Sequence, residues 1–439
     1  MPEKSDNPLK ETGPLKETGI ATRAVHGGTA PDPATGARIT PVYQTASYVF
    51  ADVAHAQRLF DLEEFGQIYS RITNPTVQAL EGKMAALDGG VGAIAAASGH
   101  AAQFLAFLPL MATGDRFIAS RNLYGGSITQ FGRSFARLGW HVDFVDPWER
   151  GSFRAALTPR TRAIFTESLS NPGGLMVDLE AIAAVAGEAR IPLIVDNTLA
   201  TPALLRPFEW GADIAVYSTT KFIAGHGNSI GGVIVDSGRF RWDDRTPALT
   251  APNAAYHGAN FAEKFGPLAY TVYGHAVGLR DFGAAMAPMT AFLTLTGAET
   301  LCLRMARHSE NAFLIARHLE DHAAVAWVSY AGLTSHPNHA LARKYLPGGA
   351  GAVLTFGLKG GYDAGIRMVE ACRLFSHLAN VGDTRSLIIH PASTTHRQLS
   401  EAERAAAGAG PDVVRLSVGI EDAHDLIADL NAALAAAAG

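Results

Sequence analysis

The sequence predicts an α/β fold in which a mostly parallel, seven-stranded sheet is followed by a smaller α+β domain. Between about residues 75 and 235, short apolar runs rich in β-forming residues alternate with helical patterns. After Gly266 this alternation stops, and long helical stretches precede shorter strands. The chain has 439 residues, more than one hydrophobic core usually holds. We therefore expect two domains.

Seven apolar runs are the predicted strands of the large sheet. Several of them, such as residues 193–195, lack polar alternation, which is typical of strands covered on both faces by helices. The seventh run follows the sixth without room for a crossover helix, so we expect it to be antiparallel. The runs are Val91–Ala97, Arg116–Ser120, His141–Val145, Arg162–Thr166, Pro192–Val195, Asp213–Tyr217 and Gly231–Val235.

Helix signals complete the pattern. One helix is expected to begin at Asn74-Pro75 and to end at Gly89-Gly90, because apolar residues recur there at helical spacing. A second covers Leu301–His318, and strands follow at Val353–Leu358 and Val413–Val418. The domain boundary is placed near residue 290. This gives a large domain over residues 76–290 and a C-terminal domain over residues 291–439.

Composition excludes several classes of function. The first 20 residues are polar and lack the apolar run of a secretion signal, so they are expected to be a disordered tail. No segment approaches the roughly 20 apolar residues that cross a bilayer. A net charge of -5 argues against nucleic-acid binding. Only Cys302 and Cys372 are present, which suggests neither disulfides nor a metal site. We expect a soluble, cytoplasmic protein.

Chemistry is expected where the strands end, because ligands of open α/β sheets bind beyond the carboxyl ends of their strands. Ser98-Gly99-His100 follows the first run and starts a helix, where backbone amides can cradle a phosphate. A plain strand-to-helix turn is the alternative. Asp196 ends a buried strand, where a carboxylate needs a cation such as a protonated pyridine nitrogen. A helix cap is the alternative there.

Lys221 comes directly after a buried strand, which is unusual because the charge of a lysine normally stays in water. Desolvation and neighbouring positive charge would lower its pKa from about 10.4 and make the nucleophilic amine accessible. Ser218 and Thr220 bracket it, and their hydroxyls can face one side and bind phosphate. A structural lysine is the alternative, but Asp196 and the Ser-Gly turn favour catalysis. Asn171 offers an amide at another strand end.

These residues resemble the pyridoxal-phosphate enzymes of cysteine and methionine metabolism, which have the fold type I architecture. The resemblance runs from about Thr22 to the carboxyl end. Its most specific part is Asp213–Gly227, in which Lys221 resembles the lysine that holds the cofactor as a Schiff base. Within the family, the chain is most similar to the sulfhydrylases that act on O-acetylhomoserine. The segments that carry this similarity are Tyr69–Thr76, Ser98–Gln103, Leu123–Gly126, Val195–Pro202 and His390–His396.

The resemblance implies how the cofactor would be held. Asp196 would pair with the pyridinium nitrogen, Tyr124 would stack on the ring, and Asn171 would lie close to it. Arg415 would clamp the α-carboxylate of the substrate, which suits its planar fork, and Asn380 would assist it. The residues expected to bind the phosphate are Ser98, Gly99, His100, Ser218 and Thr220.

The resemblance also implies an oligomer. An N-terminal arm over residues 21–75 would contact the neighbouring subunit, and its Tyr69 and Arg71 would reach that subunit's phosphate. An active site would then require at least a dimer, and the family is commonly tetrameric. We expect a homotetramer built from active dimers.

The implied reaction is γ-replacement on O-acetyl-L-homoserine by sulfide or a small thiol, giving L-homocysteine or methionine and acetate in methionine biosynthesis. Lys221 and Tyr124 are the expected proton-transfer groups. O-Succinylhomoserine sulfhydrylase, cystathionine γ-synthase and γ-lyase are alternatives, the last disfavoured by Gly126 where γ-lyases commonly carry a cysteine. A noncatalytic cofactor-binding protein is a remote alternative. A nicotinamide-dependent reductase is disfavoured because the dinucleotide-binding glycine pattern is missing.

Overall fold

A computed structural model describes residues 17–395, 397–398, 400–401, 404 and 408–438. Most of the predicted tail, residues 1–16, and His396 of the last resemblance segment lie outside the described residues. The chain divides into two compact units. Unit 1 comprises Met1–Leu110, Asp213–Thr219 and Ser229–Thr300, and unit 2 comprises Met111–Ala212, Thr220–Asn228 and Leu301–Gly439. The expected arm, large domain and C-terminal domain are not tested by these units and stay predictions.

The seven predicted runs form one mixed sheet with the strand order β1-β7-β6-β5-β4-β2-β3. β7 is antiparallel to both β1 and β6, which confirms the expectation for the seventh run. β2 pairs in parallel with β3 and β4, and β4 pairs in parallel with β5. Every strand agrees with its predicted run to within one residue at each end. The strands are β1 Gly92–Ala96, β2 Arg116–Ser120, β3 His141–Val145, β4 Thr161–Glu167, β5 Leu193–Asp196, β6 Ile214–Ser218 and β7 Gly232–Asp236.

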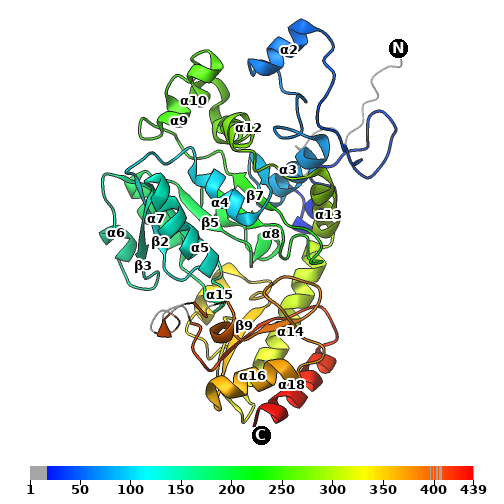
Figure 1. Cartoon of the computed structure of the whole chain (residues 1–439), viewed down its shortest axis with the longest axis vertical. Helices are drawn as coiled ribbons and strands as arrows, with labels where there is room; N and C mark the ends of the chain where they lie inside the picture. The colour runs from blue at the N-terminus through cyan, green and yellow to red at the C-terminus, as the bar shows by residue number, and fades with distance from the viewer. Residues whose placement is uncertain (1–16, 396, 399, 402–403, 405–407, 439) are drawn as a thin grey trace. The chain divides into compact units, whose positions relative to one another are not determined.

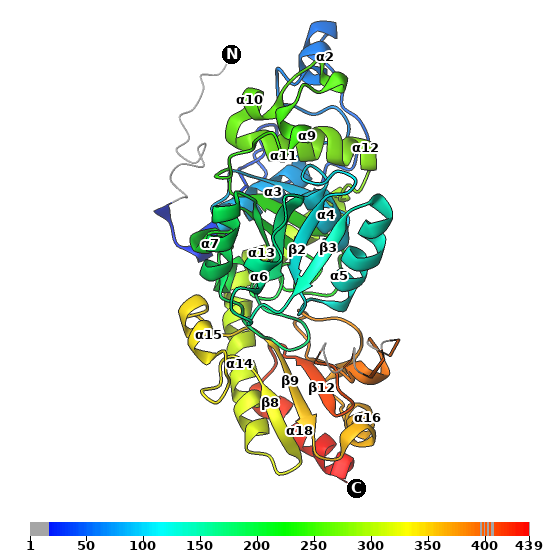
Figure 2. The same ribbon diagram turned by 90° about the vertical axis from the view of Figure 1, so that its left-hand side faces the viewer.

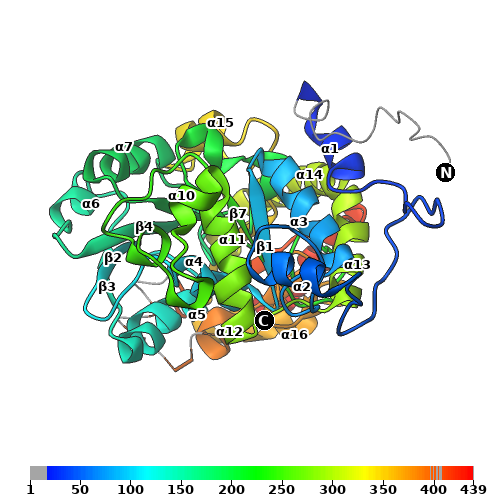
Figure 3. The same cartoon turned by 90° about the horizontal axis from the view of Figure 1, so that it is seen from above.

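The predicted helix at Asn74 is α3, Pro75–Asp88, in unit 1. The Asn74 side chain caps it by accepting a hydrogen bond from Thr76 N at 3.0 Å, and Gly89 ends it with a φ of 78°. Within unit 1, α3 packs beside α1 and α13 (Figure 3). The helices of unit 1 are α1 Ile20–His26, α2 Val53–Phe60, α3, α4 Gly99–Phe107, α9 Pro247–Thr250, α10 Phe261–Phe265, α11 Ala269–Tyr273, α12 Arg280–Phe282 and α13 Pro288–Glu299.

Unit 2 contains a second, five-stranded sheet with the order β10-β11-β12-β9-β8 (Figure 2). Its α14, Leu301–Glu320, and β9 and β12 confirm the predicted helix and strands of the α+β part. The strands are β8 Val325–Ser329, β9 Val353–Leu358, β10 Ser376–His377, β11 Leu387–Ile389 and β12 Val413–Ser417. The other helices are α5 Gly125–Thr129, α6 Ser152–Ala155, α7 Leu179–Ala189, α8 Thr201–Leu204, α15 His339–Tyr345, α16 Gly361–Ala371 and α18 Ala423–Ala438.

The core of this second sheet is formed by its inner face and by α14, α16 and α18. Leu354, Phe356 and Leu416 on the strands are fully buried, as are Met368 and Leu430 on the helices. α16 and α18 lie side by side against the sheet (Figure 1). No described helix is both long and apolar enough to cross a membrane.

Candidate active site

Lys221 lies in the segment that follows β6 and belongs to unit 2. Its Nζ donates a hydrogen bond to Asn380 Oδ1 at 2.5 Å. Burial, and then the nearby positive charge of Arg415, lower the pKa of the Lys221 amine to about 8. A substantial fraction of this side chain is therefore neutral and nucleophilic at neutral to weakly alkaline pH.

The backbone around Lys221 is fixed from two sides. Gly382 has a φ of 80°, and a Cβ at this position would come within 2.6 Å of Phe222 N and 2.9 Å of the Lys221 carbonyl carbon. Only glycine therefore permits this close approach. From α14, the buried Arg304 donates to the carbonyl oxygens of Phe222 and Ile223 at 2.6 and 3.1 Å. The amine is thus carried by a rigidly held segment.

Arg415, on β12, is the second cation of this group, and only 7% of it is exposed. Its Nη1 donates to Asn171 Oδ1 at 3.1 Å and its Nη2 donates to the Asn380 carbonyl at 2.9 Å. Its Nε is buried and has no hydrogen-bond partner among the described residues. Burial lowers the pKa of Arg415 to about 10, so it remains a cation near neutrality. An anionic group such as a carboxylate would satisfy this unused N–H.

Two carboxylates end neighbouring parallel strands, since Glu167 of β4 is paired in register with Asp196 of β5. Asp196 Oδ1 accepts hydrogen bonds from Thr198 N at 3.0 Å and from Thr198 Oγ1 at 2.5 Å. Burial, and then the charge of Asp196, raise the pKa of Glu167 well above its ordinary value. Asp196 lies at the strand end where the sequence predicts it. The two hydrogen bonds from Thr198 hold its carboxylate in place.

Glu167 connects several of the predicted site residues, and sequence reasoning missed it. Its Oε1 accepts from Tyr124 N at 2.7 Å and its Oε2 accepts from Asn171 N at 3.2 Å. The signal was present, because Glu167 directly follows the predicted run Arg162–Thr166, as Asp196 follows its own strand. Within unit 2, a chain of hydrogen bonds that includes Glu167 links the predicted site residues Tyr124, Asn171, Arg415, Asn380 and Lys221. Asp196 lies beside Glu167 on the next strand, and Thr220 precedes Lys221 in the chain.

Unit 1 holds the remaining predicted phosphate ligands. Ser98 caps α4 by accepting from Ala101 N at 3.1 Å, so Gly99 and His100 form the start of that helix. A Cβ at position 99 would lie 2.8 Å from Ser218 Cβ, which means that the helix start packs directly against the end of β6. Helix N-termini bind anions through their first amides and their dipole. This arrangement fits a phosphate, and a side chain at position 99 would fill it.

Tyr69 and Arg71 lie together on the N-terminal part of unit 1. The Arg71 guanidinium carbon lies 5.3 Å from the centroid of the Tyr69 ring. Both side chains are exposed, 42% in the case of Tyr69. Their expected contact with the phosphate of a neighbouring subunit stays a prediction.

The sequence and the fold match those of known proteins. Residues 21–435 match the family model described as Cys/Met metabolism PLP-dependent enzyme. The chain belongs to this family, whose members depend on pyridoxal phosphate. Among its relatives, O-acetyl-L-homoserine sulfhydrylase 1 of Thermus thermophilus is 52% identical over 94% of this chain and 99% of that protein. The homocysteine synthase of Schizosaccharomyces pombe is 48% identical over 94% of this chain and 97% of its own.

A solved structure agrees with the fold. The putative O-acetylhomoserine (thiol)-lyase of Campylobacter jejuni, whose crystal structure contains a pyridoxyl-lysine monophosphate, superposes with a TM-score of 0.93. It is 38% identical and covers 95% of this chain and all of its own. The fold type I class predicted from the sequence is confirmed, as are the family and the cofactor.

Glu167→Gln is expected to lower kcat/KM by about tenfold or more, because Gln offers one acceptor oxygen to two backbone amides and turns an NH₂ toward the other. Tyr124 and Asn171 would shift, and KM should rise together with a fall in kcat. Steady-state kinetics check this. The control is Glu81→Gln, a buried glutamate that accepts from Ala95 N at 2.8 Å. Equal kinetic losses in both variants would contradict a positioning role for Glu167.

Proposed function

We propose that the protein catalyses γ-replacement on O-acetyl-L-homoserine with sulfide, or a small thiol, to give L-homocysteine, or methionine, and acetate in methionine biosynthesis. The observation that carries this proposal is the bridge made by Asn380, whose side chain accepts from Lys221 and whose carbonyl accepts from Arg415. A nucleophilic amine and a carboxylate-binding guanidinium thus meet at one residue. The similarity to an O-acetyl-L-homoserine sulfhydrylase and to a homocysteine synthase supports this substrate within the family.

The residues present fit pyridoxal phosphate. Lys221 would bond to the aldehyde carbon, Asp196 would pair with the ring nitrogen, and Tyr124 would stack on the ring beside Asn171. When bound, the cofactor supplies an electron-withdrawing ring that stabilises negative charge at the substrate carbons. The phosphate would be held by Ser98, Gly99, His100, Ser218 and Thr220, with Tyr69 and Arg71 from a neighbouring subunit.

The roles of the side chains follow from their contacts. Arg415 would hold the α-carboxylate through its unused Nε–H, which fixes the substrate relative to Lys221. Lys221, whose pKa is about 8, would take the proton from Cα, and Tyr124 would share the later proton transfers at Cβ. Acetate would leave from Cγ, and sulfide would form its bond to the same carbon.

Product analysis of the holoenzyme tests the substrate. Acetyl- and succinyl-homoserine are each incubated with sulfide or cysteine, and with no thiol. We expect homocysteine from the acetyl ester and sulfide to give the highest kcat/KM. Cystathionine as the preferred product would indicate a cystathionine γ-synthase. Formation of 2-oxobutyrate without any thiol, as fast as homocysteine forms with sulfide, would indicate a γ-lyase. Either result would overturn the proposed reaction.

The oligomer is part of the proposal. Large apolar side chains are exposed on residues 39–65 of the N-terminal segment, among them Val49 at 98% and Val53 at 76%. Such a set of exposed apolar side chains supports burial against a second copy of the chain. We infer an assembly of at least a dimer, with a homotetramer as the expected form, in the cytoplasm. Sedimentation of the holoenzyme measures the stoichiometry, and a monomer would contradict the shared site.

Reattachment of pyridoxal phosphate to the cofactor-free protein is expected to speed up as the pH rises through about 8, because only the neutral Lys221 amine can bond. In Arg415→Gln the midpoint should move to higher pH, since the guanidinium charge that disfavours the ammonium form is gone. It should stay below 10.5, because burial, the larger cause of the lowered pKa, remains. The rate of reconstitution, followed by absorbance against pH, measures both. An unchanged midpoint in Arg415→Gln would contradict the coupling.

A further inference from the structure

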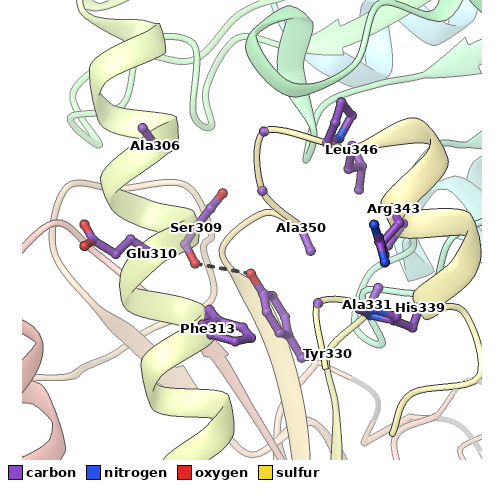
Figure 4. A pocket seen from close by; sticks show the side chains of 15 residues that line it. Ala306, Ser309, Glu310, Phe313, Tyr330, Ala331, His339, Arg343, Leu346 and Ala350 are labelled. Atoms are coloured by element: carbon purple, nitrogen blue, oxygen red, sulfur yellow. Dashed lines mark hydrogen bonds between the residues drawn. The ribbon is translucent and has the colours of Figure 1, made fainter. Parts of the chain in front are cut away.

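A pocket of about 540 Å³ lies within unit 2, and none of the residues assigned to the Lys221 site lines it. One wall is a face of α14 that includes Ala306, Ser309 and Phe313. The other wall is made by α15 and by the loop that follows it (Figure 4). α14 also carries Arg304, which holds the lysine segment, but the residues that line the pocket are different ones.

Much of the lining is apolar. Phe313 is 38% exposed and lies beside Tyr330, which is almost fully buried. The Tyr330 hydroxyl is already used, since it donates to Ser309 O at 3.3 Å and to Gly351 O at 2.9 Å. The exposed Phe313 ring therefore offers the pocket an apolar surface, to which the hydrocarbon part of a ligand can bind.

Two buried polar atoms in the lining have no hydrogen-bond partner within the part of the chain that the structure describes. They are Ser309 Oγ, on a residue that is only 4% exposed, and His339 Nδ1. Buried polar atoms are almost always paired, and a polar group of a ligand in this cavity can supply the missing partner. Both can donate a hydrogen bond.

The lining contains one basic residue, Arg343, and one acidic residue, Glu310. Arg343 follows His339 by one helical turn, and no carboxylate of the described residues lies within ion-pair distance of it. The acidic residue of the lining, Glu310, pairs instead with Arg307 at 3.6 Å on the same helix. Figure 4 shows the Glu310 carboxylate on the far side of α14 from Arg343. One uncompensated positive charge remains at the pocket.

We propose that this pocket binds a small monocarboxylate whose remainder is apolar. The carboxylate accepts hydrogen bonds from Arg343 and from the donors Ser309 and His339, and the apolar part lies on Phe313. A single unpaired cation beside an apolar ring matches one negative charge, whereas a phosphate dianion would leave a charge unpaired. The site does not depend on the proposed reaction, because it uses none of the residues assigned to that reaction.

Calorimetric titration of the holoenzyme with phenylacetate, and with the neutral phenylacetamide of the same shape, tests the proposal. Phenylacetate is expected to bind at least about tenfold more tightly than the amide. Arg343→Gln should weaken the binding of phenylacetate by about tenfold or more. Ala306→Leu should block the pocket while leaving the hydrogen-bond donors of Arg343, Ser309 and His339 in place. Both variants should retain turnover and thermal stability, because Ala306 and Arg343 are exposed and outside the Lys221 site.

Phenylacetate could also bind at Arg415, so Arg415→Gln is the matched control. Binding that survives in Arg415→Gln and is lost in Arg343→Gln supports the pocket. The proposal would be overturned if binding were lost in Arg415→Gln and survived in Arg343→Gln. It would also be overturned by equal affinity for phenylacetate and phenylacetamide, or by no binding to the wild-type holoenzyme. The readout is binding without turnover, so a failure here is distinct from a failure of the proposed function.

Discussion

Lys221→Ala is expected to lower kcat by at least about 10³-fold, because one change removes both the amine that would hold the cofactor and the base that would take the Cα proton. The segment that carries this residue is held by Arg304 and Gly382, so the fold should persist. Turnover of O-acetylhomoserine with sulfide, measured on protein of confirmed folding, checks the loss. A variant that kept more than about a tenth of wild-type turnover would contradict the assignment.

Lys83 provides a matched control for this experiment. It is fully buried, and burial lowers the pKa of its amine to about 8, as for Lys221. Its Nζ, however, donates to the backbone carbonyls of Ala24 and Val25 at 2.6 and 3.2 Å. Lys83→Met is therefore expected to lower thermal stability and leave kcat of the folded enzyme near wild type. The contrast separates catalysis from the mere burial of a lysine.

Asp196→Asn is expected to lower kcat by about 10²- to 10³-fold, because the variant keeps the shape of the side chain but loses the charge that would pair with the ring nitrogen. Loss of that charge should also lower the pKa of Glu167, since Asp196 is one of the causes that raise it. Steady-state kinetics and the absorption spectrum of the bound cofactor are the measurements. An unaltered spectrum together with full turnover would exclude the pairing.

The alternative for Asp196, a cap for the following turn, makes a different prediction. Asp178 is such a cap, because its side chain accepts from Ala181 N at the start of α7. Asp178→Asn is expected to reduce stability slightly and to leave kcat unchanged. If Asp196→Asn behaved in the same way, Asp196 would be a cap and not a partner of the cofactor.

The local parts of the fold could be predicted from the sequence because their signals are local. Apolar runs marked the seven strands of the large sheet, and Asn74 and Gly89 marked the ends of α3. The strands β8, β10 and β11 were missed. β10 has two residues and β11 has three, too few to form a recognisable run. β8 does contain an apolar run, residues 325–328, and it was overlooked.

The candidate site, too, could be predicted from local signals only in part. Lys221 and Asp196 follow apolar strands and could be found by position, whereas Arg415 and Asn380 came from the family resemblance alone. The hydrogen bonds that connect them join residues 159 and 244 positions apart, which only the folded chain brings together. Glu167 also follows its strand, so its position could have been recognised, but its contacts with the backbone amides of Tyr124 and Asn171 could not be predicted from the sequence.

Borohydride reduction of the active holoenzyme, followed by peptide mapping, most directly tests whether Lys221 bonds to the cofactor. Reduction makes the link between the cofactor and its lysine permanent, so the labelled peptide identifies the residue. We expect one pyridoxyl group per chain, on the peptide that contains Lys221, and loss of activity in proportion to labelling. A label on Lys83 or any other lysine, or an unlabelled Lys221 in active enzyme, would contradict the assignment on which the proposed reaction rests.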